Sequence, residues 1–164
     1  MCKQKMNTLG DIQAMLDAPT YSEIEPNLFI GSIEAVRTPS VIQSMDAVVS
    51  LVREINVPRK FFDGVLREDT RHLYIDIRDR PKKNISKHFN TTSTFIAQQL
   101  KEGKRVMVHC MAGRSRSVTI VSFYLMHTHG WDAYRALKTI KEKRPVARPN
   151  RGFITQLIES KNTN

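Results

Sequence analysis

The fold is decided by Val106-Met107-Val108-His109-Cys110-Met111-Ala112-Gly113-Arg114-Ser115-Arg116-Ser117, a short apolar run followed by small and basic residues. Residues 106–108 predict a buried strand, and the apolar residues between 118 and 126 predict a helix. A loop that ends a strand and opens a helix directs backbone N–H groups and the positive end of the helix dipole to one point. We therefore expect an anion-binding site at residues 109–117.

Cys110 and Arg116 stand at the two ends of this loop with five residues between them, so a thiol and a guanidinium face one cavity. Amide groups and a helix terminus favour the thiolate, and cysteines at such positions have pKa values of about 3.5–7.5. Arg116 offers a fork of donors that fits two phosphoryl oxygens. Ser117 is expected to donate to the departing thiolate. A core cysteine is the alternative, but it would bring uncompensated arginines into the interior.

Length and composition indicate one globular domain. The chain has 164 residues, of which 40% are hydrophobic and 26% charged. No run approaches the roughly 18 apolar residues of a membrane span, and the N-terminal residues lack the apolar stretch of a signal peptide. We expect an intracellular protein, cytoplasmic or nuclear. Its two cysteines, one of them next to the N-terminus, exclude a disulfide framework.

The formal net charge of +10 favours anionic partners such as phosphoproteins, nucleic acid or acidic lipid surfaces. Charge alone does not choose among these partners. A solvated basic surface is the simpler alternative.

The rest of the chain alternates between patterns typical of strands and of helices. Strands are expected at residues 27–31, 47–52, 72–77 and 106–108. Helices are expected at residues 41–45, 85–100, 117–128, 131–143 and 153–158, with a surface loop at 56–69. This order predicts an α/β fold: a single domain with a central, mostly parallel, twisted sheet flanked by helices.

The two ends of the chain are expected to lie outside that domain. Residues 1–20 read as an amphipathic extension with Leu9, Ile12, Met15 and Leu16 at helical spacing, ending near Pro19. This extension is a candidate contact for a homodimer. Residues 161–164 are expected to form a tail.

Residues 109–116 resemble the HCxxGxxR signature of the cysteine-based protein tyrosine phosphatases. The longer form HCxAGxSRS, which ends at Ser117, is similar to the loop of the dual-specificity branch. Residues 143–150, read KRPVARPN, and residues 26–32, read PNLFIGS, also resemble that branch. The resemblance covers roughly residues 22–160.

The resemblance implies a catalytic domain at residues 21–160 that hydrolyses phosphate monoesters on tyrosine and on serine or threonine residues of phosphorylated proteins. Cys110 would form a cysteinyl-phosphate without any cofactor, and no His, Cys or carboxylate cluster has the spacing of a metal site. The phosphate would be held by Met111, Ala112, Gly113, Arg114, Ser115 and Arg116.

A general acid is needed to protonate the leaving oxygen and then to activate water. Asp79 fits the position that the family gives to this acid, in a loop that follows a strand. Asp76 is the competitor, but it lies on the strand itself. A solvated loop carboxylate or a helix cap is the alternative role for Asp79.

Three further residues have open roles. His109 precedes the nucleophile, and the resemblance makes it a support of the loop, since neighbouring side chains on a strand point to opposite faces. Asn150 is either a second support of the loop or a plain turn residue. Arg114 replaces an apolar residue common in this branch, so it is either a solvated rim residue or a binder of additional negative charge.

Two rival functions remain from the sequence. The same loop could act on phosphoinositides or on RNA 5′ ends, although RNA-directed relatives usually read Asn-Arg-Thr-Gly where this chain has Ser115-Arg116-Ser117-Val118. Nucleic acid is therefore not expected as the principal substrate. A non-catalytic phosphate-binding module is disfavoured because Cys110, Arg116 and Asp79 are all present.

Overall fold

A five-stranded mixed sheet forms the centre of the computed structural model, which describes residues 9–162. The strands are β1 (Tyr21–Glu25), β2 (Leu28–Gly31), β3 (Ala47–Val52), β4 (Arg71–Asp76) and β5 (Val106–His109), in the spatial order β1-β2-β5-β3-β4. Only the β1–β2 pair is antiparallel, and the other three pairs are parallel. The predicted α/β class with a mostly parallel sheet is confirmed.

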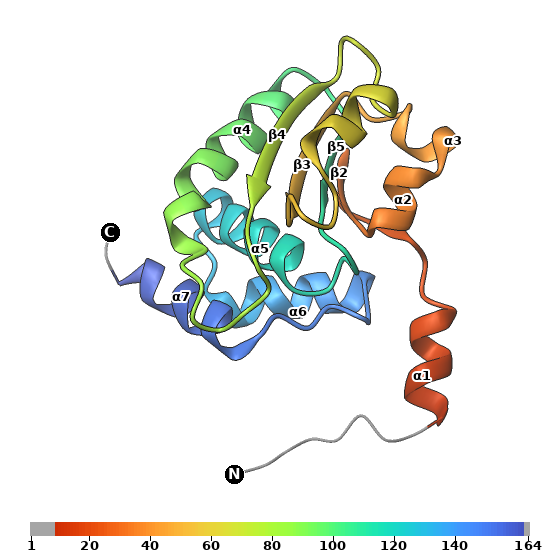
Figure 1. Ribbon diagram of the computed structural model, residues 1–164. Coiled ribbons are helices and arrows are strands. Elements are labelled where there is room, and N and C mark those ends of the chain that lie inside the picture. Colours follow the sequence, from red (N-terminus) through yellow and green to blue (C-terminus); the bar gives the residue numbers. More distant parts are fainter. Residues whose placement is uncertain (1–8, 163–164) are drawn as a thin grey trace.

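Helices cover both faces of this sheet (Figure 1). One face carries α4 (Phe89–Lys101), α5 (Arg116–His129), α6 (Ala133–Lys143) and α7 (Arg151–Lys161), with α5 in contact with the other three. The opposite face carries α2 (Ile33–Arg37), α3 (Pro39–Ile42) and the 3-10 helix η1 (Arg59–Gly64). A 3-10 turn, η2 (Ser86–His88), precedes α4, and α1 (Leu9–Leu16) projects from the body.

Two hydrophobic cores follow from the alternation of side chains along the strands. All six residues of β3 are buried, with Val49 and Leu51 in the core under α5 and Val48 and Val52 in the core under η1. A strand covered on both faces favours apolar residues along its length, which explains the apolar run; Ser50 is its one polar residue. This layering fixes the carboxyl end of β5, from which the loop begins.

Some predicted bounds were wrong. The strand β1 and the helix α2 were not expected, and the helix predicted at residues 41–45 lies at Pro39–Ile42. Proline fits the first turn of a helix, where its missing N–H has no partner to lose, so α3 begins with Pro39 rather than after it. The polar β1 escaped the pattern because it is an edge strand.

Two other helices begin later than predicted, and the segment predicted as a loop contains a 3-10 helix. The helix predicted from Trp131 begins at Ala133, because the Asp132 side chain accepts a hydrogen bond from the Arg135 N–H and caps it. The helix predicted from residue 85 begins at Phe89, after η2. The segment 56–69, expected to be a loop, contains η1.

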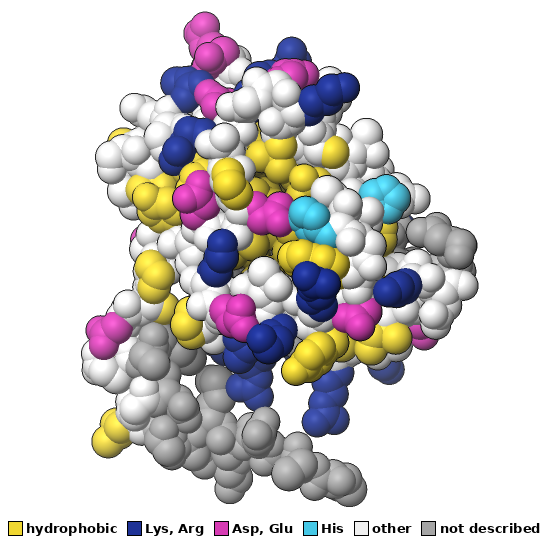
Figure 2. All heavy atoms as spheres, turned by 180° about the vertical axis from the view of Figure 1, so that it is seen from behind, with side chains coloured by type: hydrophobic (Ala, Val, Ile, Leu, Met, Phe, Trp, Pro, Cys, Tyr) yellow, Lys and Arg dark blue, Asp and Glu magenta, His cyan; other side chains and the backbone are white. Residues whose placement is uncertain are grey.

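The termini extend beyond the two cores. Within α1 the side chains of Leu9, Ile12 and Leu16 are exposed. The predicted extension at 1–20 and the predicted tail at 161–164 lie partly outside the described residues. Among residues 9–162, no helix combines the length and the apolar character that crossing a membrane requires. Figure 2 shows Lys and Arg side chains spread over the face that it presents, with Asp and Glu among them.

Candidate active site

The loop between β5 and α5 begins at Cys110, whose side chain is 1% exposed. Its third following residue, Gly113, has a φ of +62°, and a Cβ added there would lie 2.7 Å from the carbonyl oxygen of Gly31. Only glycine satisfies both the left-handed backbone and this close approach to β2. Gly113 therefore allows the tight turn that brings the loop close to the end of β2.

The environment of Cys110 favours its thiolate. Burial raises the pKa of the thiol, but the Arg116 guanidinium, the Ser117 hydroxyl and the backbone N–H groups of Ser117 and Arg114 lower it, and the net pKa lies below the usual value. The Ser117 Oγ lies 3.3 Å from the Cys110 Sγ. The loop thus provides a nucleophile that is ionised more readily than an ordinary cysteine.

Arg116 is held rigidly at the base of this loop. Its side chain is 7% exposed, and its Nη1 donates to the carbonyl oxygen of Ile77 at 3.0 Å. Its buried Nε has no hydrogen-bond partner among the residues that the structure describes. Buried polar groups are nearly always paired, so a free buried N–H donor beside the thiol fits the oxygen of a bound phosphate.

Asp79 is attached to the loop through two neighbours. Its Oδ1 accepts hydrogen bonds from the Ser115 Oγ at 2.8 Å and from the Asn150 Nδ2 at 2.7 Å. The Asn150 N–H in turn donates to the Ser115 Oγ at 3.1 Å, which closes the triangle. The competitor Asp76 lies elsewhere, in an ion pair of 2.8 Å with the Nε of Arg53. The structure thus brings Asp79, but not Asp76, into hydrogen-bond contact with the loop.

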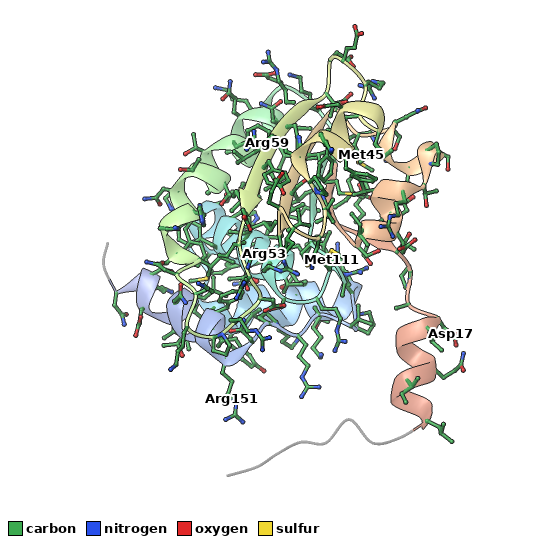
Figure 3. All side chains as sticks on the ribbon, in the orientation of Figure 1. Asp17, Met45, Arg53, Arg59, Met111 and Arg151 are labelled. Atoms are coloured by element: carbon green, nitrogen blue, oxygen red, sulfur yellow. The ribbon has the colours of Figure 1, made fainter. Side chains whose placement is uncertain are left out.

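A hollow of about 650 Å³ opens beside Asp79 and Ser115. Its other lining residues come from the segment that leads into α7, namely Arg148, Pro149, Asn150, Arg151 and Ile154. Arg148 and Arg151 are exposed, and Arg151 extends from the start of α7 away from the body (Figure 3). Asp79, the predicted acid, therefore lines the same hollow as the cations Arg148 and Arg151.

Arg144 is a residue that the sequence reasoning missed. It is 2% exposed, and its Nε donates to the Gly113 carbonyl oxygen at 2.7 Å. Its Nη2 reaches the Ala112 carbonyl oxygen at 3.4 Å, and its Nη1 donates to the Pro19 carbonyl oxygen and the Ser22 Oγ. Arg144 satisfies loop carbonyls that would otherwise be buried without donors. Residues 143–150 resemble the dual-specificity branch, but the sequence alone assigned no role to Arg144.

His109 and Arg114 were also predicted as site residues. His109 is buried, and its Nδ1 lies 3.3 Å from the carbonyl oxygen of Cys110. The Arg114 Nε donates to the Val146 carbonyl oxygen at 3.3 Å, and the Arg114 carbonyl oxygen accepts from the Arg148 N–H. His109 thus holds the first peptide of the loop, and Arg114 connects the loop to the segment at Val146 and Arg148.

Comparisons with known proteins agree on one family. The family model described as "Dual specificity phosphatase, catalytic domain" matches residues 28–163. The chain is 38% identical over 141 residues to dual specificity protein phosphatase 1 of Arabidopsis thaliana, a match that covers 83% of this chain and 66% of that protein. It is 34% identical over 164 residues to tyrosine-protein phosphatase yvh1 of Schizosaccharomyces pombe, covering 93% of this chain and 47% of that protein.

A solved structure is also similar. The crystal structure of human DUSP28 superimposes with a TM-score of 0.77 and 26% identity, over 88% of this chain and 95% of that one. The chain spans just under two thirds of the length of the Arabidopsis relative and about half of the fission-yeast relative.

Proposed function

Because the chain belongs to the dual specificity phosphatase family, we propose that it hydrolyses phosphate monoesters on tyrosine, serine and threonine residues of proteins. Residues 21–160 form the catalytic domain in this proposal. The observation that carries it is the pairing of Cys110, whose thiol pKa is lowered, with the buried, unpaired Nε of Arg116 in one loop. A nucleophile and a fixed cation at one point are what phosphoryl transfer needs.

In the first step the Cys110 thiolate attacks phosphorus and the bond from phosphorus to the ester oxygen breaks. The Arg116 guanidinium and the N–H groups of residues 111–116 bind the phosphoryl oxygens, because they are oriented before the reaction begins. Asp79 gives its proton to the leaving oxygen. Since the Asp79 Oδ1 already accepts two hydrogen bonds, this proton is carried by Oδ2. The product is a cysteinyl-phosphate.

In the second step the Asp79 carboxylate removes a proton from water as the water oxygen attacks phosphorus. The phosphorus–sulfur bond breaks, inorganic phosphate leaves, and the electron pair of the bond returns to Cys110. The Ser117 hydroxyl, 3.3 Å away, donates to the released thiolate. Asp79 ends protonated and ready for the next turnover.

Arg144, His109 and Asn150 act by holding this machinery in place. Arg144 binds the carbonyl side of the loop, so that the N–H groups of the same peptides are left to face the phosphate. Asn150 holds Asp79 rather than the phosphate. We assign all three as positioning residues.

Acidic substrates fit the surface around the site. Arg148 and Arg151 line the hollow beside Asp79, and a second hollow of about 460 Å³ is lined on its basic side by Arg53, Arg78, Lys83 and Lys87. The cations of these two hollows attract negative charge next to the phosphorylated residue. We therefore expect acidic or multiply phosphorylated protein segments as partners.

Two further expectations belong to the same proposal. The catalytic thiol requires a reducing compartment, cytoplasm or nucleus, because oxidation removes the nucleophile. The exposed apolar residues Leu9, Ile12 and Leu16 of α1 make this helix the contact for a homodimer. Sedimentation of the full chain and of a chain that lacks residues 1–16 tests the dimer, which should be lost in the shorter chain; Pro19, an acceptor for Arg144, is kept.

The function is tested with a substrate panel of phosphotyrosine peptides, phosphothreonine peptides, phosphoinositides and RNA 5′-triphosphates, all in the presence of a metal chelator. We expect turnover of both kinds of phosphopeptide. Turnover of lipid or RNA alone would contradict the proposal.

The acid is tested by Asp79→Asn, with Asp76→Asn as the matched control. Asp79→Asn should lower kcat by about 10²–10⁴-fold for substrates with poor leaving groups. Substrates with good leaving groups should be affected less, because they need no proton. A large loss in Asp76→Asn instead would move the role to that residue.

A further inference from the structure

Three polar side chains from neighbouring strands meet behind the nucleophile loop. Ser50 on β3 pairs in register with His109 on β5 and lies between β5 and β4, which carries His72. The Ser50 Oγ lies 2.6 Å from the His109 Nε2 and 2.8 Å from the His72 Nε2. Ser50 is 0% exposed and His109 is 0% exposed. The two rings are therefore linked by one buried hydroxyl.

The direction of each hydrogen bond follows from what each atom can do. A carbonyl oxygen only accepts, so the contact of 3.3 Å between His109 Nδ1 and the Cys110 carbonyl oxygen requires a proton on Nδ1. In a neutral imidazole the Nε2 is then an acceptor, and the Ser50 hydroxyl must donate to it. That leaves a lone pair on Ser50 for the His72 Nε2, which must carry its proton.

We infer that Ser50 is a positioning residue for the nucleophile: its hydroxyl holds His109 in the Nδ1–H tautomer, and His72 holds the hydroxyl. The inference rests on the proposed role of Cys110. The hydrogen bonds run in one direction, from His72 through Ser50 and His109 to the Cys110 carbonyl oxygen, and bonds aligned in this way strengthen one another. Removing the middle member leaves a buried acceptor on His109 without a donor.

The surroundings keep both rings neutral. Burial lowers the pKa of His109 to about 3; the hydrogen bond to the Cys110 carbonyl oxygen opposes this shift, and His72 and Arg116 add to it. Burial and the Arg59 guanidinium lower the pKa of His72 to about 4, and the Asp63 carboxylate opposes them. The Phe62 ring lies 4.5 Å from the His72 ring and 5.8 Å from the His109 ring, centroid to centroid, and is 2% exposed. Neutral rings are the condition under which the hydroxyl must donate to His109.

The connection to catalysis passes through one peptide plane. The C=O of Cys110 and the N–H of Met111 belong to the same planar unit and point in opposite directions. A donor that holds the carbonyl therefore also holds the Met111 N–H, which is part of the loop that binds the phosphate. Ser50 thus acts on the loop without touching substrate.

The test measures the ionisation of Cys110 directly, from the pH dependence of its alkylation by iodoacetamide, read by mass spectrometry of the Cys110 peptide. Ser50→Ala should raise the apparent pKa of Cys110 by about one unit, a tenfold loss of thiolate at low pH. Ser50→Thr should keep the wild-type profile, because it retains the hydroxyl. His72→Leu should give a smaller shift, since Ser50 can still donate to His109.

Ser122→Ala is the matched control, because it removes another fully buried hydroxyl that bonds only within α5, to the Val118 carbonyl oxygen. If Ser50→Ala loses stability as Ser122→Ala does but keeps the wild-type pKa of Cys110, Ser50 is purely structural and the inference is overturned. The His109 tautomer is measured in the wild type by ¹⁵N NMR of the imidazole, which does not depend on any variant folding. A proton on Nε2 instead of Nδ1 overturns the inference as well.

These readouts do not require phosphatase activity. An inactive wild type with the expected Cys110 shift would contradict the proposed function and leave the inference standing. An active enzyme in which Ser50→Ala does not shift the Cys110 pKa would support the proposed function and overturn the inference.

Discussion

Asp79 and Asn150 lie far apart in the sequence, yet the Asn150 Nδ2 donates to the Asp79 Oδ1 at 2.7 Å. Asn150 also caps α7, because its Oδ1 accepts from the Phe153 N–H at 2.9 Å. One side chain therefore joins the proposed general acid to a helix end. The position of the acid depends on α7 as well as on the loop that carries it.

The two tasks of Asn150 can be separated. Serine is as good an N-cap as asparagine, so Asn150→Ser should keep the stability of α7 while it loses the donor to Asp79. We expect kcat to fall between about 10-fold and 100-fold for poor leaving groups, because a misplaced acid reacts less often. Steady-state kinetics and thermal unfolding are the measurements. An unchanged kcat with an intact fold would show that Asp79 does not need Asn150.

Arg144 should matter for stability as well as for activity. Arg144→Met keeps a long side chain but leaves the Gly113 and Pro19 carbonyl oxygens without their donor. Each unsatisfied buried group costs about 1–3 kcal/mol, so the free energy of unfolding should fall by at least this amount. Urea denaturation measures it. A variant as stable as the wild type would mean that water replaces the guanidinium at no cost.

The sequence predicted the loop because its signals are local: an apolar strand, small residues and an apolar helix follow one another within a few residues. Arg144 and Ser50 could not be found in this way. Their partners, Gly113 and His109, come close only once β5 has paired between β2 and β3. A lone serine in an apolar run and an arginine in a basic segment carry no pattern of their own. Edge strand β1 was missed for a related reason, since its residues are mostly polar and only Ile24 is fully buried.

Arg148 and Arg151, which line the hollow beside Asp79, should set substrate preference. Arg148→Gln and Arg151→Gln should each raise KM up to about fivefold for phosphopeptides with acidic neighbours, from about 1 kcal/mol for an exposed ion pair. KM for a small aryl phosphate should not change, because it has no acidic neighbours to contact Arg148 or Arg151. Lys101→Gln, at an exposed position at the end of α4, is the control. An equal rise in KM for all three variants would mean that the net positive charge of the protein attracts the acidic peptide, without direct contact to Arg148 or Arg151.

The free energy of unfolding at acid pH should depend on the burial of His72. Its pKa is lowered from 6.5 to about 4, chiefly by burial, so the unfolded chain binds a proton that the folded protein excludes. The free energy of unfolding should therefore fall as the pH drops from about 6.5 to about 4, and this loss should level off below that. His72→Gln has no proton to bind and should show a shallower decline. The comparison is made by urea denaturation at several pH values, and identical slopes would show that His72 is not protected from protonation.

The cysteinyl-phosphate is the central claim of the mechanism. It is measured most directly by rapid quenching of the enzyme with a ³²P-labelled phosphopeptide, followed by mass spectrometry of the peptide that contains Cys110. We expect a phosphate on the Cys110 sulfur in the wild type and none in Cys110→Ser, and in Asp79→Asn the same adduct should accumulate when a ³²P-labelled aryl phosphate with a good leaving group replaces the phosphopeptide. Turnover in Cys110→Ser, or label on any other residue, would contradict it.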